Sequence, residues 1–180
     1  MITRRMKITS WGFVVTLVIT AWLLVSVNPI FAQTKTMNYR LSTYLSNVEV
    51  LPVGDAEGHL LGLFSRKGLA SFENGEVATF TNWGTQDATK GRGTFDYYVM
   101  LTFDDNSTTV AKGQGTFEPG PKGLSLYKGT AEFIKGTGRF EGIKGNLSYT
   151  GRSLTPYSKE KGTMGDAYYD VTSTYTLPSK

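Results

Sequence analysis

The predicted fold is decided by residues 128–152, which read KGTAEFIKGTGRFEGIKGNLSYTGR. From residue 129 to residue 134 the side chains alternate in kind with a period of two, which is typical of a strand with two unlike faces. Four glycines follow between residues 136 and 145, where they allow the positive φ values that tight turns need. The alternation resumes at Leu147, Tyr149 and Gly151. This stretch therefore predicts two β-strands joined by a compact, glycine-rich connection.

The same period of two predicts strands on both sides of this hairpin. The strongest is at residues 94–103, where large apolar side chains occupy every second position. The pair Asn74-Gly75 marks a hairpin turn. In the strand expected at residues 107–117, Ala111, Gly113 and Gly115 leave one face nearly bare, which lets a bulky neighbour approach closely. A closing strand is expected at residues 168–177.

Two segments are less regular. Residues 59–72 are interrupted by the triplet Arg-Lys-Gly at 66–68 and predict either one bent strand or two short ones. Residues 83–92 are polar and predict a loop. With about eight strands in all and no helical periodicity after residue 33, the sequence favours an all-β barrel or sandwich of antiparallel strands.

The glycine-rich connection also carries a family resemblance. Its core FIKGTGRFEGIKG, residues 133–145, resembles the turn of the allene oxide cyclase-like barrels and, less closely, the GGTGxF segment of dirigent proteins. The resemblance covers residues 91–152 and implies a closed antiparallel β-barrel of about eight strands. A phosphate-binding loop is the other reading of these glycines, but it requires a helix after the loop, whereas a second strand is expected here.

The N-terminal segment, residues 1–32, predicts a signal peptide. Arg4, Arg5 and Lys7 precede an apolar run at residues 11–27, and a break at Asn28-Pro29 comes just before a plausible cleavage site. An uncleaved membrane anchor is the alternative. The protein is therefore expected to be secreted, periplasmic or part of the cell envelope, with residues 33–180 forming one barrel domain.

The amino-acid composition excludes several kinds of catalytic and binding site. The chain has no cysteine, so thiol catalysis and disulfides are excluded. Removal of residues 1–32 takes away three basic residues and lowers the formal charge from +4 to +1, which argues against a nucleic-acid partner. Membrane contact is expected only through an uncleaved N-terminal segment. His59, the single histidine, has no evident catalytic partner, and the acidic pair at 104–105 fits a hairpin turn better than a calcium site. We expect no metal and no cofactor.

The cyclase resemblance extends to particular residues. Phe80-Thr81-Asn82 matches an FTN sequence whose asparagine holds a water in the cyclase pocket, so the resemblance implies a polar role in the barrel lumen for Asn82. The cyclase motif YExNE falls on residues 44–49, where its catalytic glutamate is replaced by Leu45 while Asn47 matches. The cyclase pocket cysteine has no counterpart. The resemblance thus implies that the barrel is kept and the cyclase chemistry lost, although a shifted alignment makes Glu49 a minor catalytic candidate.

Three functions are compatible with this sequence, the third of which is an envelope protein that interacts through its outer surface. The first is an exported, non-catalytic barrel that binds a small hydrophobic or phenolic molecule, and the alternative for its lumen is that side chains simply fill it. The second is an isomerase or cyclase that steers a reactive lipid or phenolic intermediate, which requires an ionisable lumen group such as Glu49, Asp96 or Glu132. Both families that the sequence resembles form oligomers, so the resemblance makes part of the outer face a candidate homo-oligomer interface. The residues expected to line the lumen are Asn47, Phe80, Asn82, Tyr97, Val99, Phe133, Tyr149 and Tyr175.

Overall fold

The computed structural model describes residues 33–158 and 160–179. The expected signal peptide or anchor, residues 1–32, lies outside this range. Within it the chain is all-β, apart from two single-turn 3₁₀ segments, and no described helix is long and apolar enough to cross a bilayer.

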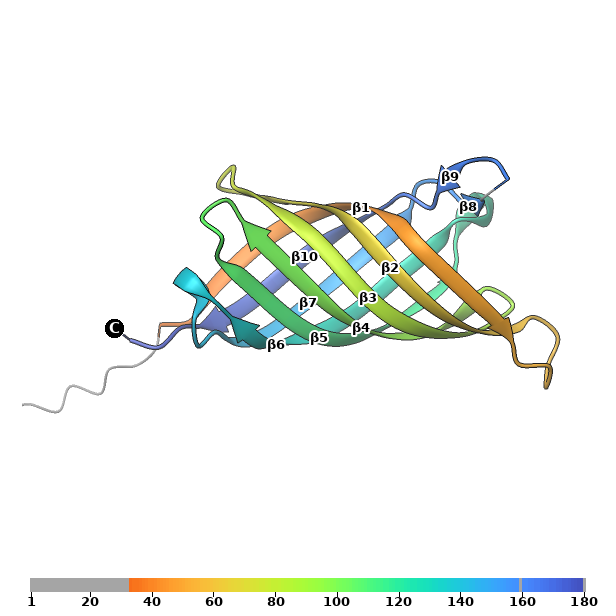
Figure 1. Cartoon of the computed structure of the whole chain (residues 1–180), viewed down its shortest axis with the longest axis horizontal. Coiled ribbons are helices and arrows are strands. Elements are labelled where there is room, and N and C mark those ends of the chain that lie inside the picture. Colours follow the sequence, from red (N-terminus) through yellow and green to blue (C-terminus); the bar gives the residue numbers. More distant parts are fainter. Residues whose placement is uncertain (1–32, 159, 180) are drawn as a thin grey trace, which may run out of the picture. The chain divides into compact units, whose positions relative to one another are not determined.

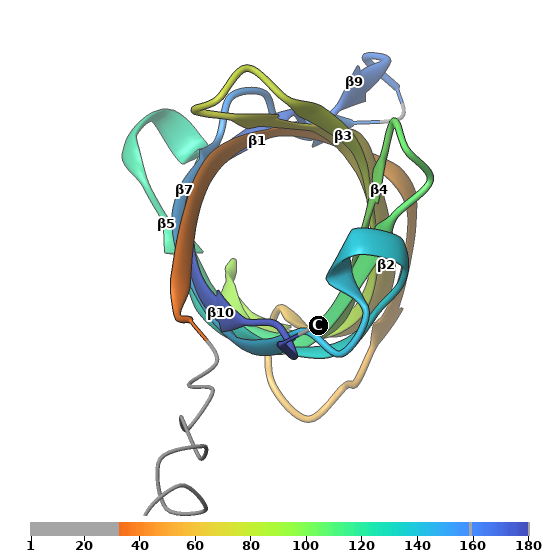
Figure 2. The same cartoon turned by 90° about the vertical axis from the view of Figure 1, so that its left-hand side faces the viewer.

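Eight long strands form a closed antiparallel barrel in the order β1-β10-β7-β6-β5-β4-β3-β2. A short separate hairpin, β8-β9, lies between β7 and β10 in the chain. Viewed from one end, the strands form a complete ring (Figure 2). The elements are β1 Lys35–Pro52, β2 His59–Phe72, β3 Val77–Thr89, β4 Arg92–Phe103, β5 Thr108–Pro119, η1 Pro121–Gly123, β6 Ser125–Gly136, η2 Gly138–Phe140, β7 Lys144–Ser153, β8 Tyr157–Ser158, β9 Thr163–Met164 and β10 Ala167–Thr176.

The two ends of the barrel differ, and both are visible in Figure 1. At one end, which we call the base, β1 begins and β10 ends, and the connections 73–76, 104–107 and 137–143 turn the chain. At the other end, the rim, lie the connections 53–58, 90–91, 120–124 and 154–166.

The β6–β7 hairpin is confirmed. Its connection contains η2, and Gly138 and Gly142 have φ of 60° and 73°, values that a β-carbon makes unfavourable. The turn directs Phe140 into the base of the barrel, where its side chain is buried. The glycine-rich motif therefore both reverses the chain and supplies one residue of the core.

The prediction of a polar loop at residues 83–92 is wrong. Strand β3 continues to Thr89, and only Lys90 and Gly91, both with positive φ, connect it to β4. The polar residues of this segment belong to an antiparallel strand whose outer face meets water, so their polarity does not indicate a loop. Residues 59–72, left open between one strand and two, form the single strand β2.

The alternation predicted for the other strands is confirmed and decides which side chains face inward. On β4 the inward residues are the large apolar ones, whereas on β5 the inward residues Ala111, Gly113 and Gly115 are small. A β-carbon at Gly113 would lie 2.6 Å from Tyr97 Cζ, and one at Gly115 would lie 2.6 Å from Phe95 Cζ. The bare face of β5 therefore makes room for the aromatic rings of the neighbouring strand.

Strand β1 changes phase at a β-bulge. Leu45 is paired with Arg66 on the lumen side, but the next paired residue is Asn47, opposite Ser65, so Ser46 is the inserted residue. Because side chains alternate strictly along a strand, one inserted residue moves every later side chain to the opposite face. After the bulge the even-numbered residues of β1 continue the inward face.

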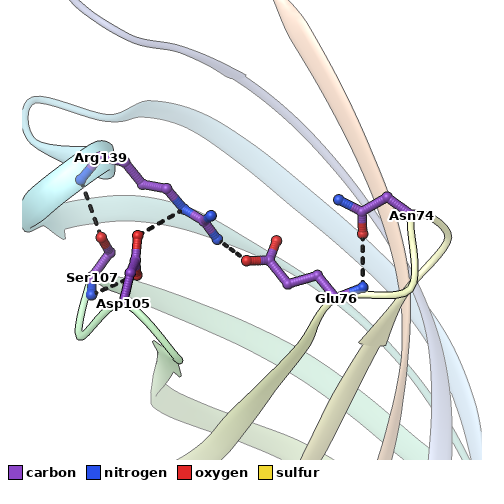
Figure 3. A network of polar contacts seen from close by, with 5 residues as sticks. All are labelled: Asn74, Glu76, Asp105, Ser107 and Arg139. Carbon is purple, nitrogen blue, oxygen red and sulfur yellow. Dashed lines mark hydrogen bonds and ion pairs between the residues drawn. The ribbon is translucent and has the colours of Figure 1, made fainter.

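Aromatic side chains fill the base of the barrel. The Phe103 ring lies 5.5 Å from that of Phe72 and 4.8 Å from that of Phe140. The Arg139 guanidinium covers this group, with its Cζ 4.7 Å from the centroid of Phe103 and 4.9 Å from that of Phe140. Figure 3 shows how Arg139 is held from outside by Glu76 and Asp105, while its backbone N–H donates to the Ser107 hydroxyl. The base of the barrel is therefore filled by aromatic rings and covered by Arg139.

Candidate functional site

The rim half of the lumen contains a cavity of about 220 Å³. Most of its wall is made of aromatic and aliphatic side chains, and its polar groups are five tyrosine hydroxyls and the side chains of Arg66, Asn82, Gln86 and Ser125. The lining residues are Tyr39, Leu41, Leu45, Phe64, Arg66, Phe80, Asn82, Gln86, Phe95, Tyr97, Val99, Phe117, Ser125, Tyr127, Leu147, Tyr149, Tyr169 and Val171. An eight-stranded barrel of this kind has room for one small ligand.

Five of the eight residues expected to line the lumen border this cavity: Phe80, Asn82, Tyr97, Val99 and Tyr149.

Phe133 and Tyr175 face inward at a different level. Their rings lie 6.3 Å apart, and the Tyr175 ring lies 6.4 Å from that of Phe140. These two residues therefore belong to the packed base rather than to the cavity. The alternation of the strands identifies their face but not their height along the barrel axis.

Asn47 and Glu49 lie on the outer face instead of in the lumen. Both side chains are exposed, and the Asn47 amide donates to Glu49 Oε1 over 3.2 Å. The cause is the bulge at Ser46, which reverses the faces of the rest of β1. The other two carboxylates considered for a catalytic role, Asp96 and Glu132, are exposed as well. None of the three candidate acids borders the cavity.

Arg66 is a charged lumen residue that was missing from the residues expected to line the lumen. It lies on β2 with 7% of its surface exposed. Its Nε donates to the Thr43 hydroxyl over 3.0 Å, and its Nη2 donates to the Gly165 carbonyl oxygen over 2.6 Å. A signal was present: residue 66 has the same parity as the inward residues Phe64 and Phe72, so a charge there stands on an apolar face.

Two polar atoms on the cavity wall are buried without a hydrogen-bond partner in the described part of the chain: Asn82 Oδ1 and the Tyr149 hydroxyl. The pKa of the Tyr149 hydroxyl is raised, first by burial and then by the neighbouring Tyr97. Buried polar groups are normally paired, and an unpaired one costs roughly 1–3 kcal/mol. Such atoms are candidates for hydrogen bonds to a bound molecule.

The lumen tyrosines remain neutral at physiological pH. Burial is the main reason that the pKa values of Tyr39, Tyr97 and Tyr149 lie well above the ordinary value of 10. Burial also raises the pKa of Tyr169 to about 12, against the opposing charge of Arg66. Neutral phenols offer hydrogen-bond donors to a ligand without adding negative charge to the lumen.

His59 is paired at the rim, which the sequence did not reveal. Its Nδ1 lies 2.5 Å from Asp55 Oδ1, and its Nε2 lies 2.9 Å from Asp87 Oδ1. Hydrogen bonds to Asp55 and then Asp87 raise the histidine pKa, and the bond to His59 lowers the pKa of Asp55. The three residues join the connection 53–58 to β3. No group of three or more possible metal ligands occurs within residues 33–158 and 160–179.

No protein-family model matches this sequence, and no curated protein is significantly similar to it.

Proposed function

We propose that this protein is an exported, non-catalytic β-barrel that binds one small hydrophobic or aromatic molecule in the rim half of its lumen. The observation that carries the proposal is the contrast between the two halves of the barrel. The base is filled by Phe72, Phe103 and Phe140, whereas the rim half keeps a cavity of about 220 Å³. Side chains alone therefore do not account for the interior.

The size of the cavity suits a ligand of one ring. A dry cavity of about 150 Å³ is large enough to hold benzene. The larger space here accommodates a six-membered ring with a short substituent.

The chemistry of the wall supports the same ligand class. Phe95 and Tyr127 offer edge-to-face contacts, and their own rings meet in that way at a centroid distance of 6.4 Å. Asn82 Oδ1 and the Tyr149 hydroxyl supply unpartnered polar atoms beside the apolar surface. Apolar walls with a few convergent polar groups are typical of small-molecule sites.

Binding is favoured over turnover because the carboxylates that a cyclase or isomerase needs are not near the cavity. Glu49, Asp96 and Glu132 are all exposed. Export rests on the character of residues 1–32, and membership of the allene oxide cyclase-like barrels rests on the turn at residues 133–145. We retain both as parts of the proposal.

The experiment is a titration of the purified protein with a neutral monocyclic aromatic such as 3-phenylpropanol. The variant Leu147→Trp fills the cavity, since Leu147 is buried and borders it. The matched control is Leu69→Trp, the same change at a site on the outer face that is 50% exposed.

The proposal predicts saturable binding of 3-phenylpropanol at one site per chain, lost in Leu147→Trp and retained in Leu69→Trp. Equal binding by both variants would place the ligand outside the lumen and contradict the proposal. Absence of binding by the unmodified protein would contradict it as well.

A further inference from the structure

Arg66 is a buried cation inside the proposed binding cavity. Its guanidinium has five N–H groups, of which Nε–H and one Nη2–H are used by Thr43 and Gly165. Both acceptors are uncharged. For the remaining three N–H groups, the described residues provide no acceptor.

No acidic side chain of the chain neutralises this cation. All fifteen aspartates and glutamates lie within the described residues, and none forms an ion pair with Arg66. Ion pairs are formed by three other arginines, Arg40, Arg92 and Arg139, and all three are considerably more exposed than Arg66. An arginine cannot lose its proton at physiological pH, and a buried charge without a partner is unfavourable. The lumen therefore contains one uncompensated positive charge.

A second polar side chain of the cavity wall lies on the strand next to that of Arg66. Asn82 is the direct cross-strand partner of Arg66 in the β2–β3 ladder, and both side chains face the cavity. Directly opposed residues have β-carbons roughly 4.5–5.5 Å apart, whereas the guanidinium itself reaches toward Thr43 on β1 and toward Gly165. On the other side, the Tyr169 ring lies with its centroid 6.0 Å from Arg66 Cζ.

We propose that the natural ligand is a small aromatic carboxylic acid whose carboxylate binds to the free edge of Arg66. This inference rests on the proposed function and names the chemical class of its ligand. The planar guanidinium matches a carboxylate with two parallel N–H···O bonds. The ring of the ligand occupies the apolar space bordered by Phe95, Tyr127 and Val99.

The cavity volume limits the length of this acid. About 220 Å³ accommodates one ring and a short acid side chain but not the full length of a long-chain fatty acid. A dianion is also disfavoured, because Arg66 is the only basic residue among those that border the cavity.

The test compares two probes of nearly identical shape, 3-phenylpropanoate and its uncharged amide 3-phenylpropanamide, by calorimetric titration at pH 7. The purified protein is expected to bind the acid roughly 10- to 100-fold more tightly than the amide, the range typical of a hydrogen-bonded charge. In Arg66→Met the preference is expected to disappear while the amide still binds. Arg66→Lys keeps the charge without the planar fork and is expected to retain part of the preference.

Equal affinities of the two probes for the unmodified protein would overturn the inference and leave the proposed function standing, because the amide would still occupy the cavity. An undiminished preference for the acid in Arg66→Met would also overturn it. If neither probe binds, both the inference and the proposed function fail. The comparison on the unmodified protein needs no variant, so it remains decisive even if Arg66→Met does not fold.

Discussion

The packing of tyrosine against strand glycines yields a sharp prediction for two glycine-to-alanine changes. Gly129 and Gly62 both face the lumen from the middle of a strand, and neither has a positive φ. A β-carbon at Gly129 would lie 2.5 Å from the Gln114 carbonyl oxygen and 2.7 Å from Tyr149 Cζ. At Gly62 the nearest atoms, at 2.9 Å, all belong to the flexible side chain of Gln86.

These contacts predict different changes in the free energy of unfolding for Gly129→Ala and Gly62→Ala. In Gly129→Ala the Gln114 carbonyl belongs to the β5–β6 ladder and the Tyr149 ring packs against the core, so neither moves freely. Overpacking of this kind costs about 1–3 kcal/mol, partly offset by the roughly 0.4–1 kcal/mol that alanine gains through the unfolded state. The expected net loss is about 1–2 kcal/mol. In Gly62→Ala the Gln86 side chain rotates away, and the free energy of unfolding stays within about 0.5 kcal/mol of the unmodified protein.

Urea unfolding followed by far-ultraviolet circular dichroism measures both variants. The account predicts a lower transition midpoint for Gly129→Ala at an unchanged m-value, and a thermal midpoint lower by about 2–8 °C. It also predicts weaker ligand binding, because Tyr149 is displaced into the cavity. If both variants were equally stable, the close approach of Tyr149 to β6 would not limit the packing, and the reasoning would be refuted.

Three other predictions concern the base, the rim and the cavity wall. Arg139→Ala is expected to lower the free energy of unfolding by about 1–2 kcal/mol. Arg40→Ala, which removes an exposed ion pair on the outer wall, is expected to cost clearly less, and similar losses for the two variants in chemical denaturation would contradict the capping role. The His59 pKa, measured by NMR titration, is expected to lie above the ordinary value of about 6.5 and to fall in Asp55→Asn, and an unchanged value would refute the pairing. Tyr149→Phe, which removes an unpartnered hydroxyl, is expected to be neutral or stabilising by about 1 kcal/mol, and a clear loss would indicate a hidden partner.

The pH dependence follows from the raised histidine pKa. Its contribution to stability is fully present below the ordinary histidine pKa and is lost as the pH rises through the higher pKa of the folded protein. The lowered pKa of Asp55 acts in the opposite sense, since its contribution is lost as the pH falls through that value. Attachment of the connection 53–58 to β3 is therefore expected to be strongest in mildly acidic solution. Hydrogen exchange of the backbone amides of residues 53–58 at pH 5.5 and pH 8.5 tests this expectation, which predicts greater protection at pH 5.5.

Strict alternation made part of this fold predictable. Along β4 every second residue from Phe95 to Phe103 is large and apolar, so the inward face was correctly assigned. The glycine pattern at residues 136–145 likewise identified the β6–β7 hairpin. In both cases the signal is local, because the period and the turn chemistry are contained within about a dozen residues.

Other features depend on contacts that a local pattern does not contain. The bulge at Ser46 is one inserted residue, and the sequence around it does not mark which residue is skipped, so Asn47 and Glu49 were assigned to the wrong face. The polar end of β3 resembles a loop because its outer face meets water. Arg66 looked like an interruption of a strand, although its parity placed it in the lumen. Only the barrel as a whole shows that Phe133 belongs to the packed base and Val99 to the cavity.

The most direct test of the central claim is native mass spectrometry of the protein purified gently from its own source. The account predicts one small organic molecule bound per chain, released on unfolding, and carrying an acidic group on an aromatic body. Leu147→Trp, purified in parallel, should show the mass of the protein alone, while Leu69→Trp should retain the molecule. A ligand-free mass for the unmodified protein, with no shift after exposure to 3-phenylpropanoate or 3-phenylpropanol, would contradict a binding function for the lumen.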